Sequence, residues 1–209
     1  GAVISPLLAN VYLHYALDRW VHAWRQHRAR GTVAVVRYAD DFVVTFQYRD
    51  EGERFREELG RRLERCGLTL HPQKTRLIEF GRFAASNRRR RGEGKPETFD
   101  FLGFTHCCAK RRSNGGFTLR RLTIAKRARA FLQRVKRGLR ARISQPVAAQ
   151  GAFLRRALRG YFQYHAVPGN YAALKAVRRE TTRLWLRLLR RRSQKHALSW
   201  TRMQRLEAR

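Results

Sequence analysis

The chain contains the stretch Val33-Ala34-Val35-Val36-Arg37-Tyr38-Ala39-Asp40-Asp41-Phe42-Val43-Val44-Thr45-Phe46, in which two adjacent carboxylates lie between two runs of β-branched and aromatic residues. Such runs favour extended strands, and the short segment Ala39-Asp40-Asp41 between them is able to turn. The stretch therefore predicts a β-hairpin with Asp40 and Asp41 at its tip. Two fixed negative charges there would attract a divalent metal ion. In an arbitrary protein the same pattern can also be a solvated turn.

The rest of the 209-residue chain is strongly cationic, with 47 Lys and Arg residues against 15 Asp and Glu and a net charge of +32. The charge is uneven, because residues 101–209 contain 28 Lys and Arg and only two acidic residues, Glu180 and Glu207. A charge of this size indicates a polyanionic partner, since contacts with phosphates release counterions. Nucleic acid is the predicted partner, bound mainly by the C-terminal half.

Composition also narrows the class of protein. The hydrophobic content of 43% is enough for a packed core and excludes a disordered basic tail. No apolar stretch approaches the roughly 20 residues of a membrane span and no leader opens the chain, so a cytoplasmic protein without a membrane partner is expected. The three cysteines, Cys66, Cys107 and Cys108, are expected to be reduced thiols, because their spacing suits neither a disulfide framework nor a zinc site.

Apolar periodicity predicts the elements of the N-terminal half. A helix is expected from Pro6 to Arg28 with Ser5 as its N-cap, and a second, amphipathic helix from Asp50 to Cys66. A strand from Thr75 to Phe80 should follow the hairpin and this helix. The order predicts an α+β fold, an antiparallel sheet with helices on one face.

The C-terminal half begins with a polar segment, Ser86 to Thr98, which is predicted to be a flexible loop. Phe99 to Phe104 and Phe117 to Leu122 flank Asn114-Gly115-Gly116, which is a hairpin signal. Three basic amphipathic helices are then expected. They cover residues 124–143, 147–164 and 171–192.

Five segments occur in a fixed order along the chain. They are Gly1-Ala2-Val3-Ile4-Ser5-Pro6-Leu7-Leu8-Ala9-Asn10-Val11-Tyr12-Leu13, Tyr38-Ala39-Asp40-Asp41-Phe42, His71-Pro72-Gln73-Lys74-Thr75, Phe99-Asp100-Phe101-Leu102-Gly103-Phe104, and Arg159–Tyr164 followed by Pro168-Gly169-Asn170, Trp185 and Arg190–Lys195. Together they resemble the bacterial group II intron-encoded reverse transcriptase/maturase family. They are similar to its motif before the catalytic hairpin, its YADD box, the next motif, the primer grip and the maturase-specific thumb.

The resemblance implies a partial polymerase palm followed by an all-α basic thumb bundle. The palm, with the primer-grip hairpin, would cover residues 1–122, and the thumb, or maturase-specific domain, residues 123–209. The implied activity is RNA-directed DNA polymerase, a nucleotidyltransferase, with intron RNA maturase function. Its partners would be deoxynucleoside triphosphates, an RNA template with a DNA primer, and intron RNA. Whether it has protein partners is not indicated by the sequence.

Two Mg²⁺ ions would serve the implied reaction, held in part by Asp40 and Asp41 as catalytic and metal-binding residues. The family's third catalytic aspartate belongs to a motif upstream of Gly1, so the chain as given is expected to be catalytically incomplete. The family position of Lys74 implies a general acid toward the leaving pyrophosphate, although a plain surface lysine explains it equally well.

Binding residues complete the candidate set. The implied nucleotide- or template-binding positions are Gly1, Ser5, Pro6, Tyr38 and Ala39, and the implied primer-grip positions are Phe101, Leu102 and Gly103. Ser5 can also be interpreted as a helix N-cap, Tyr38 as a sheet-core or primer-backing residue, and the primer-grip residues as ordinary strand packing. The predicted RNA-binding cations are Arg88, Arg89, Arg90, Arg91, Lys126, Arg127, Arg134, Arg137, Arg190, Arg191 and Arg192. The spacing of Tyr161, Phe162, Tyr164 and Trp185 favours bundle core over base stacking.

Two other functions share parts of this pattern. The main alternative is a non-catalytic RNA-binding splicing factor whose palm is kept only as a scaffold. An RNA-copying RNA polymerase would share the acidic hairpin, but the segments Arg159–Tyr164 and Arg190–Lys195 fit it poorly.

Overall fold

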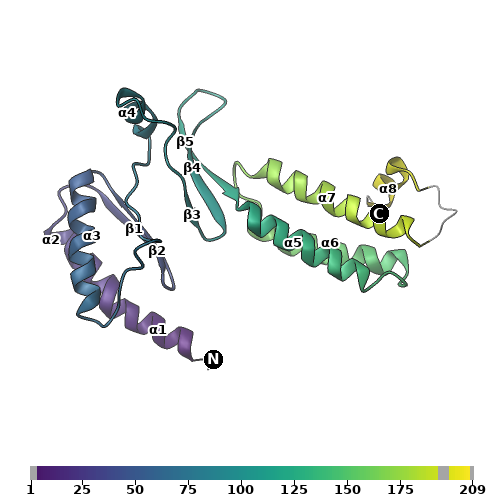
Figure 1. The fold of residues 1–209 in the computed structure, drawn as a ribbon, viewed down its shortest axis with the longest axis horizontal. Coiled ribbons are helices and arrows are strands. Elements are labelled where there is room, and N and C mark those ends of the chain that lie inside the picture. The colour runs from purple at the N-terminus through teal and green to yellow at the C-terminus, as the bar shows by residue number, and fades with distance from the viewer. Residues whose placement is uncertain (1–3, 193–197, 208–209) are drawn as a thin grey trace. The chain divides into compact units, whose positions relative to one another are not determined.

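The computed structural model describes residues 4–192 and 198–207, and the chain divides into two compact units, Gly1–Glu79 and Phe80–Arg209. The fold is mixed α+β, as predicted, with two small antiparallel sheets and helices (Figure 1). The first unit contains α1 (Ser5–Leu13), the π-helical segment η1 (His14–Asp18), α2 (Arg19–His27), β1 (Val33–Tyr38), β2 (Asp41–Phe46) and α3 (Arg49–Glu64). The second contains α4 (Ala84–Arg90), β3 (Phe99–Phe101), β4 (Phe104–Lys110), β5 (Phe117–Thr123), α5 (Ala125–Arg140), α6 (Val147–His165), α7 (Tyr171–Arg190) and α8 (Trp200–Glu207).

The first predicted helix is present as the continuous run α1, η1 and α2. Ser5 is its first residue and not its N-cap: Ile4 occupies that position without a side-chain hydrogen bond, so the predicted Ser5 cap is wrong. The apolar residues of α1 are not buried, and packing begins only at Ala16 and Leu17 within η1. The π-helical turn, which periodicity did not predict, therefore marks where the helix meets the core.

The predicted hairpin is confirmed. β1 and β2 pair antiparallel with Val35 opposite Val44 and Tyr38 opposite Asp41. Because side chains alternate between the faces of a strand, Val33 points into the core while Val36 is exposed. The core of this unit is formed by Leu17, Val21, Trp24, Val33, Phe55, Leu59 and Leu63.

The predicted amphipathic helix is also confirmed as α3, but the strand expected from Thr75 to Phe80 is wrong. Residues 75–80 have no regular structure and pair with neither sheet. The side chain of Leu77 instead rests over Gly52, where an added Cβ would lie 2.9 Å from Leu77 Cδ1. Leu77 thus packs on α3, and an apolar run without a partner strand has no ladder of hydrogen bonds to join.

The segment from Ser86 to Thr98, predicted to be a flexible loop, begins as helix α4. The side chain of Arg88 stabilises this structure, because its guanidinium contacts Glu93 and Gly94, which follow the helix. Its Nη1 lies 3.1 Å from Glu93 Oε2, and its Nε donates to the carbonyl of Gly94 at 3.2 Å. Arg88 therefore finds its partners within six residues of its own position in the sequence.

The second sheet has the strand order β3-β4-β5. The hairpin predicted across Asn114-Gly115-Gly116 exists, but it joins β4 and β5. The expected strand from Phe99 to Phe104 is interrupted by a turn at Leu102 and Gly103, so that β3 folds back on β4 with Phe101 opposite Phe104.

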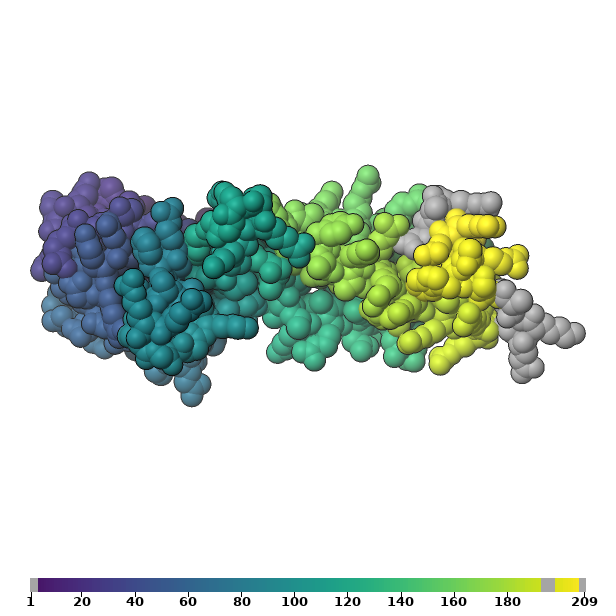
Figure 2. All heavy atoms as spheres, turned by 90° about the horizontal axis from the view of Figure 1, so that it is seen from above, coloured from purple at the N-terminus to yellow at the C-terminus, as the bar shows by residue number. Residues whose placement is uncertain are grey.

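The three predicted basic helices are present as α5, α6 and α7, and α8 is an additional helix that lies against α7 (Figure 2). Their core consists of Phe131, Val135, Leu139, Leu154, Tyr161, Val177, Trp185, Leu186, Leu188, Leu189, Leu198 and Met203. The palm–thumb boundary at residues 122 and 123 stays a prediction; the compact unit that contains these helices also contains β3, β4 and β5. Within the described ranges, none of the helices combines the length and the apolar composition that a bilayer crossing requires.

Candidate active site

The tip of the first hairpin carries both candidate metal ligands. Asp40 lies in the two-residue turn that it forms with Ala39, and Asp41 is the first residue of β2. Both are exposed, and neither carboxylate makes a hydrogen bond or ion pair within the described ranges. In a chain with so many arginines, the two acids at this turn keep their oxygens free for an external cation.

The turn is conformationally strained and braced by a side chain. Ala39 has a φ of +53°, a left-handed conformation that costs a residue with a Cβ on the order of 1 kcal/mol. Nη1 of Arg37 donates to the carbonyl oxygen of Ala39 at 2.9 Å and to Oδ1 of Asn10 at 2.9 Å. The hydrogen bonds connect the turn before Asp40 to helix α1.

Arg37 is in turn held by Asp18 in the π-helical segment. Its Nε and Nη2 each donate to one oxygen of the Asp18 carboxylate, both at 2.7 Å. The hydrogen bond from Arg37 lowers the pKa of Asp18, and the same bond raises the pKa of Arg37. The pair therefore stays charged at neutral pH. π-Helical turns occur often at functional sites, and this one carries the anchor of the acidic hairpin.

Arg37, Asp18 and Asn10 were not among the predicted site residues. A signal for Arg37 exists in the sequence, since it continues the inward-facing alternation of Val33 and Val35 along β1. A cation at a core-facing strand position needs a partner, because an unpaired charge is costly to bury. The identity of that partner depends on the pairing of a helix with the hairpin, which periodicity does not specify.

The other predicted palm residues lie as follows. Tyr38 is the last residue of β1, opposite Asp41, and is 66% exposed, so the sheet-core interpretation of Tyr38 is wrong. Ser5 and Pro6 begin α1 and are exposed, and Gly1 lies outside the described residues. Lys74 is in a turn after α3, where its exposed side chain makes no hydrogen bond or ion pair with the residues described. These assignments to nucleotide binding and catalysis stay predictions.

The two carboxylates at the hairpin match the number of protein ligands that commonly bind a magnesium ion. Mg²⁺ is commonly bound by one or two carboxylates, with water and substrate phosphates completing its octahedron. Asp40 and Asp41 provide two such carboxylates on a braced turn. In the part of the chain that the structure describes, no cluster of three or more His, Cys, Asp or Glu side chains is gathered into a metal site.

A second strained turn coincides with the predicted primer grip. Leu102 and Gly103 have φ values of +47° and +79°, and both lie in the two-residue turn between β3 and β4. Positive φ at both positions is the type I′ pattern that matches the twist of a hairpin. The hydroxyl of Tyr164 on α6 donates to the carbonyl oxygen of Leu102 at 2.7 Å. A helix of the basic bundle thus braces the turn directly.

Tyr164 was predicted to lie in the bundle core, but it is 54% exposed. Its ring stacks on that of Phe104, with the two ring centroids 5.7 Å apart. Tyr161 and Trp185 are buried as predicted, and Phe162 packs against the same core. Ala39 and Leu102 are the only non-glycine residues of positive φ in the described ranges. Each lies in a predicted functional motif, and each has its carbonyl oxygen held by a side chain.

The predicted RNA-binding cations fall into two groups. Lys126, Arg127, Arg134 and Arg137 are exposed along α5, as are Arg89, Arg90, Arg191 and Arg192 elsewhere. The others have partners in the chain itself. Arg88 and Arg91 each bond to Glu93, and the guanidinium of Arg190 donates to the carbonyl oxygen of Leu198 at 2.8 and 3.0 Å. Their part in RNA binding stays a prediction.

Comparison with known proteins bears on the whole first half of the chain. The family model described as reverse transcriptase (RNA-dependent DNA polymerase) matches residues 1–106. No match was found among curated proteins. The matched region runs from the first helix through the acidic hairpin and α3 to the turn at Leu102 and Gly103, and it covers half of the chain. The chain thus belongs to the reverse transcriptase family, the RNA-dependent DNA polymerases.

Proposed function

We propose that this chain supplies the catalytic hairpin of an RNA-directed DNA polymerase that also acts as a group II intron maturase. The polymerase activity is supported by the exposure of Asp40 and Asp41 and by the lack of partners for their carboxylates among the described residues. They lie exposed and unpaired on a turn that Arg37 braces against Asp18 and Asn10. Rigid placement of free carboxylates is what a metal-dependent transfer site requires.

In this proposal Asp40 and Asp41 hold Mg²⁺, together with an aspartate from another motif of the polymerase. Bound Mg²⁺ would activate the primer 3′-hydroxyl and neutralise charge on the triphosphate. The protein groups keep the ligands in place. Arg37 fixes the backbone before Asp40, and Asp18 keeps the guanidinium of Arg37 oriented through its two hydrogen bonds.

The substrates would be deoxynucleoside triphosphates and an RNA template with a DNA primer. In this proposal the turn contacts the primer through the partly exposed Leu102, because Gly103 is buried and its Cβ side faces the ring of Tyr164. The hydroxyl of Tyr164 holds this turn against α6. Exposed cations along α5 would then contact phosphates of the same duplex.

The maturase function is supported by the many Lys and Arg residues of the C-terminal half and by their exposure on α5. Residues 101–209 contain 28 Lys and Arg, and α5 exposes Lys126, Arg127, Arg134 and Arg137 along its length. Such a surface would bind intron RNA and favour its folded form without changing covalent bonds itself. The same surface also supports the alternative, a splicing factor whose palm is only a scaffold.

Two assays on the gene product that carries this chain separate these functions. Primer extension on matched RNA and DNA templates tests polymerase activity, and we expect Mg²⁺-dependent extension on RNA. Splicing of a precursor RNA, measured with the Asp40→Ala variant, tests the maturase. Splicing that persists in this variant while extension is lost supports both functions on one chain. The splicing-factor alternative holds if splicing is present and no template supports extension, and an intact polymerase without any effect on splicing removes the maturase part.

A further inference from the structure

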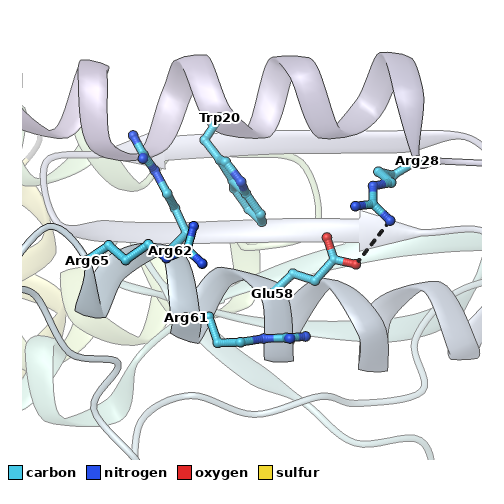
Figure 3. A pocket seen from close by; sticks show the side chains of 6 residues that line it. All are labelled: Trp20, Arg28, Glu58, Arg61, Arg62 and Arg65. Atoms are coloured by element: carbon cyan, nitrogen blue, oxygen red, sulfur yellow. Dashed lines mark ion pairs between the residues drawn. The ribbon is translucent and has the colours of Figure 1, made fainter.

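A cationic pocket lies between α2 and α3, on helices that the proposed catalysis does not use. Its volume is about 480 Å³, and Figure 3 shows the side chains that line it, with Trp20 directed from α2 toward α3 and Arg28 beside Glu58. The lining residues are Trp20, Arg28, Glu58, Arg61, Arg62 and Arg65. Four of the six are arginines, which makes this a polar pocket with an aromatic wall.

One of these arginines is fixed in place without losing its charge. The guanidinium of Arg62 donates from Nε to the carbonyl oxygen of Ala16 at 3.1 Å and from Nη2 to that of Tyr15 at 3.2 Å. Both acceptors are neutral backbone groups of η1. The contacts therefore fix the guanidinium against η1 and leave its positive charge uncompensated, on a side chain that also lines the pocket.

The single acid of the pocket is already engaged. Glu58 accepts a hydrogen bond from Nε1 of Trp24 at 2.9 Å, and its other oxygen lies 4.0 Å from Nη1 of Arg28. Arg61 and Arg65 are exposed and have no acidic partner within the described ranges. Glu58 can offset one of the four cations, so the pocket retains an excess of three positive charges.

Such an arrangement favours an anionic ligand. Like charges in a shared hollow repel one another, and the repulsion is relieved when an oxyanion binds between them. Guanidinium groups match phosphate with two parallel hydrogen bonds, and residues four apart on a helix, as Arg61 and Arg65 are, lie on the same face. Trp20, whose ring packs on Phe55 at 5.4 Å, closes one side of the pocket with apolar surface.

We propose that this pocket binds consecutive phosphates of an RNA strand, as a site separate from the acidic hairpin and from the basic helices α5 to α7. RNA is the ligand that the charge of the whole chain would bring to this surface. A free polyphosphate shares the chemistry, so the test includes it. In a chain this basic, arginines can also gather without forming a site, and a variant with matched charge decides between the two.

The test compares two double variants of the gene product that carries this chain, each lacking two exposed cations. Arg61→Gln with Arg65→Gln removes the unpaired cations of the pocket, and Arg25→Gln with Arg56→Gln removes two exposed arginines of α2 and α3 outside it. The affinity for a labelled single-stranded RNA is measured by fluorescence anisotropy from 50 to 300 mM salt. Far-UV circular dichroism and thermal unfolding of both variants check that the fold is retained.

We expect the pocket variant to bind RNA about tenfold more weakly and to lose about 1.4 units of the slope of log affinity against log salt, with less than a twofold change in the affinity of the matched variant. Replacement of Arg61 and Arg65 by lysine should restore part of the affinity. Equal weakening in the two Gln variants would overturn the proposal. A pocket variant that binds RNA normally but no longer binds tripolyphosphate would also overturn it, in favour of a free polyphosphate.

Discussion

Arg37 donates two hydrogen bonds of 2.7 Å to the two carboxylate oxygens of Asp18. The Arg37 side chain is 16% exposed, so the pair is partly shielded from water. The remaining nitrogen of the guanidinium reaches the carbonyl oxygen of Ala39, one residue before Asp40. The ion pair thereby links a π-helical turn to the acidic hairpin.

Substitution of Arg37 by lysine should impair chemistry more than binding. A lysine keeps the charge but cannot bond to Asp18 and the Ala39 carbonyl at once, so the turn that carries Asp40 would lose its brace. We expect kcat for primer extension to fall by about tenfold to a hundredfold, the range that a small misplacement of a catalytic group costs.

The measurement is single-turnover extension by the gene product that carries this chain, with the affinity for the template–primer duplex determined in parallel. Arg25→Lys on the exposed face of α2 is the matched control. An unchanged kcat in Arg37→Lys would show that the brace does not matter for catalysis.

The same ion pair predicts how stability depends on pH. The pKa of Asp18 is lowered from its ordinary 3.8, chiefly by the hydrogen bond from Arg37, and His14 Nδ1 lies 3.5 Å from the same carboxylate. A carboxyl whose pKa is lower in the folded state stabilises the fold fully above its unfolded-state pKa. This stabilisation is lost as the pH falls through the folded-state pKa.

Thermal unfolding of the wild type and of Asp18→Asn, from pH 7 to pH 2.5, tests this dependence. We expect the difference between their unfolding midpoints to be constant down to about pH 4 and to shrink below it. A difference that stays constant to pH 2.5 would mean that the charge of Asp18 contributes nothing.

Removal of the Tyr164 hydroxyl should loosen the turn at Leu102 and Gly103. Tyr164→Phe keeps the ring on Phe104 but leaves the Leu102 carbonyl without this donor, which typically costs about 1 kcal/mol. Denaturant unfolding measures this loss, and primer-duplex affinity should decrease with it if the turn contacts the primer. The control is Tyr171→Phe, at a residue that is 75% exposed. Equal effects of the two substitutions would argue against a brace.

Asn170 is predicted to be essential for the stability of the second unit. It is fully buried, accepts from the Thr123 amide at 3.0 Å, and donates to Thr123 Oγ1 at 2.7 Å and to the His165 carbonyl at 2.8 Å. Asn170→Ala strands these partners at the junction of β5 with α6 and α7, and we expect a loss of about 2–4 kcal/mol in the free energy of unfolding.

Urea unfolding followed by circular dichroism measures the Asn170→Ala effect, with Gln163→Ala on the exposed face of α6 as control. A loss below about 0.5 kcal/mol, the usual range for surface substitutions, would contradict a structural role for this asparagine.

The spacing of apolar residues within single elements predicted much of this fold. The errors concern pairing between elements that are distant in the sequence. The hairpin at Asp40 and the basic helices follow from the alternation and spacing of neighbouring residues, which are set within one element. The run from Thr75 to Phe80 has the composition of a strand but finds no partner strand in the structure. Strand composition alone cannot show whether a partner exists.

In the candidate site too, the sequence reveals local features but not the contacts between distant residues. The two aspartates are visible in the sequence, whereas their support by Arg37 and Asp18 joins residues 19 positions apart. Tyr164 fits the apolar stripe of α6, yet its hydroxyl reaches a turn 62 positions earlier in the chain. Such contacts depend on how elements pack, so composition and periodicity cannot assign them.

The proposal that most needs testing is that Asp40 and Asp41 hold the metal ions for DNA synthesis on RNA. It is tested most directly by single-nucleotide extension of a primer on an RNA template in Mg²⁺, comparing Asp40→Asn and Asp41→Asn with Glu57→Gln, an exposed acid of α3. We expect the rate of each aspartate variant to fall at least about a thousandfold, as commonly follows the removal of a catalytic group, while the duplex affinity and the rate of Glu57→Gln remain unchanged. Extension at the wild-type rate in either aspartate variant would contradict it.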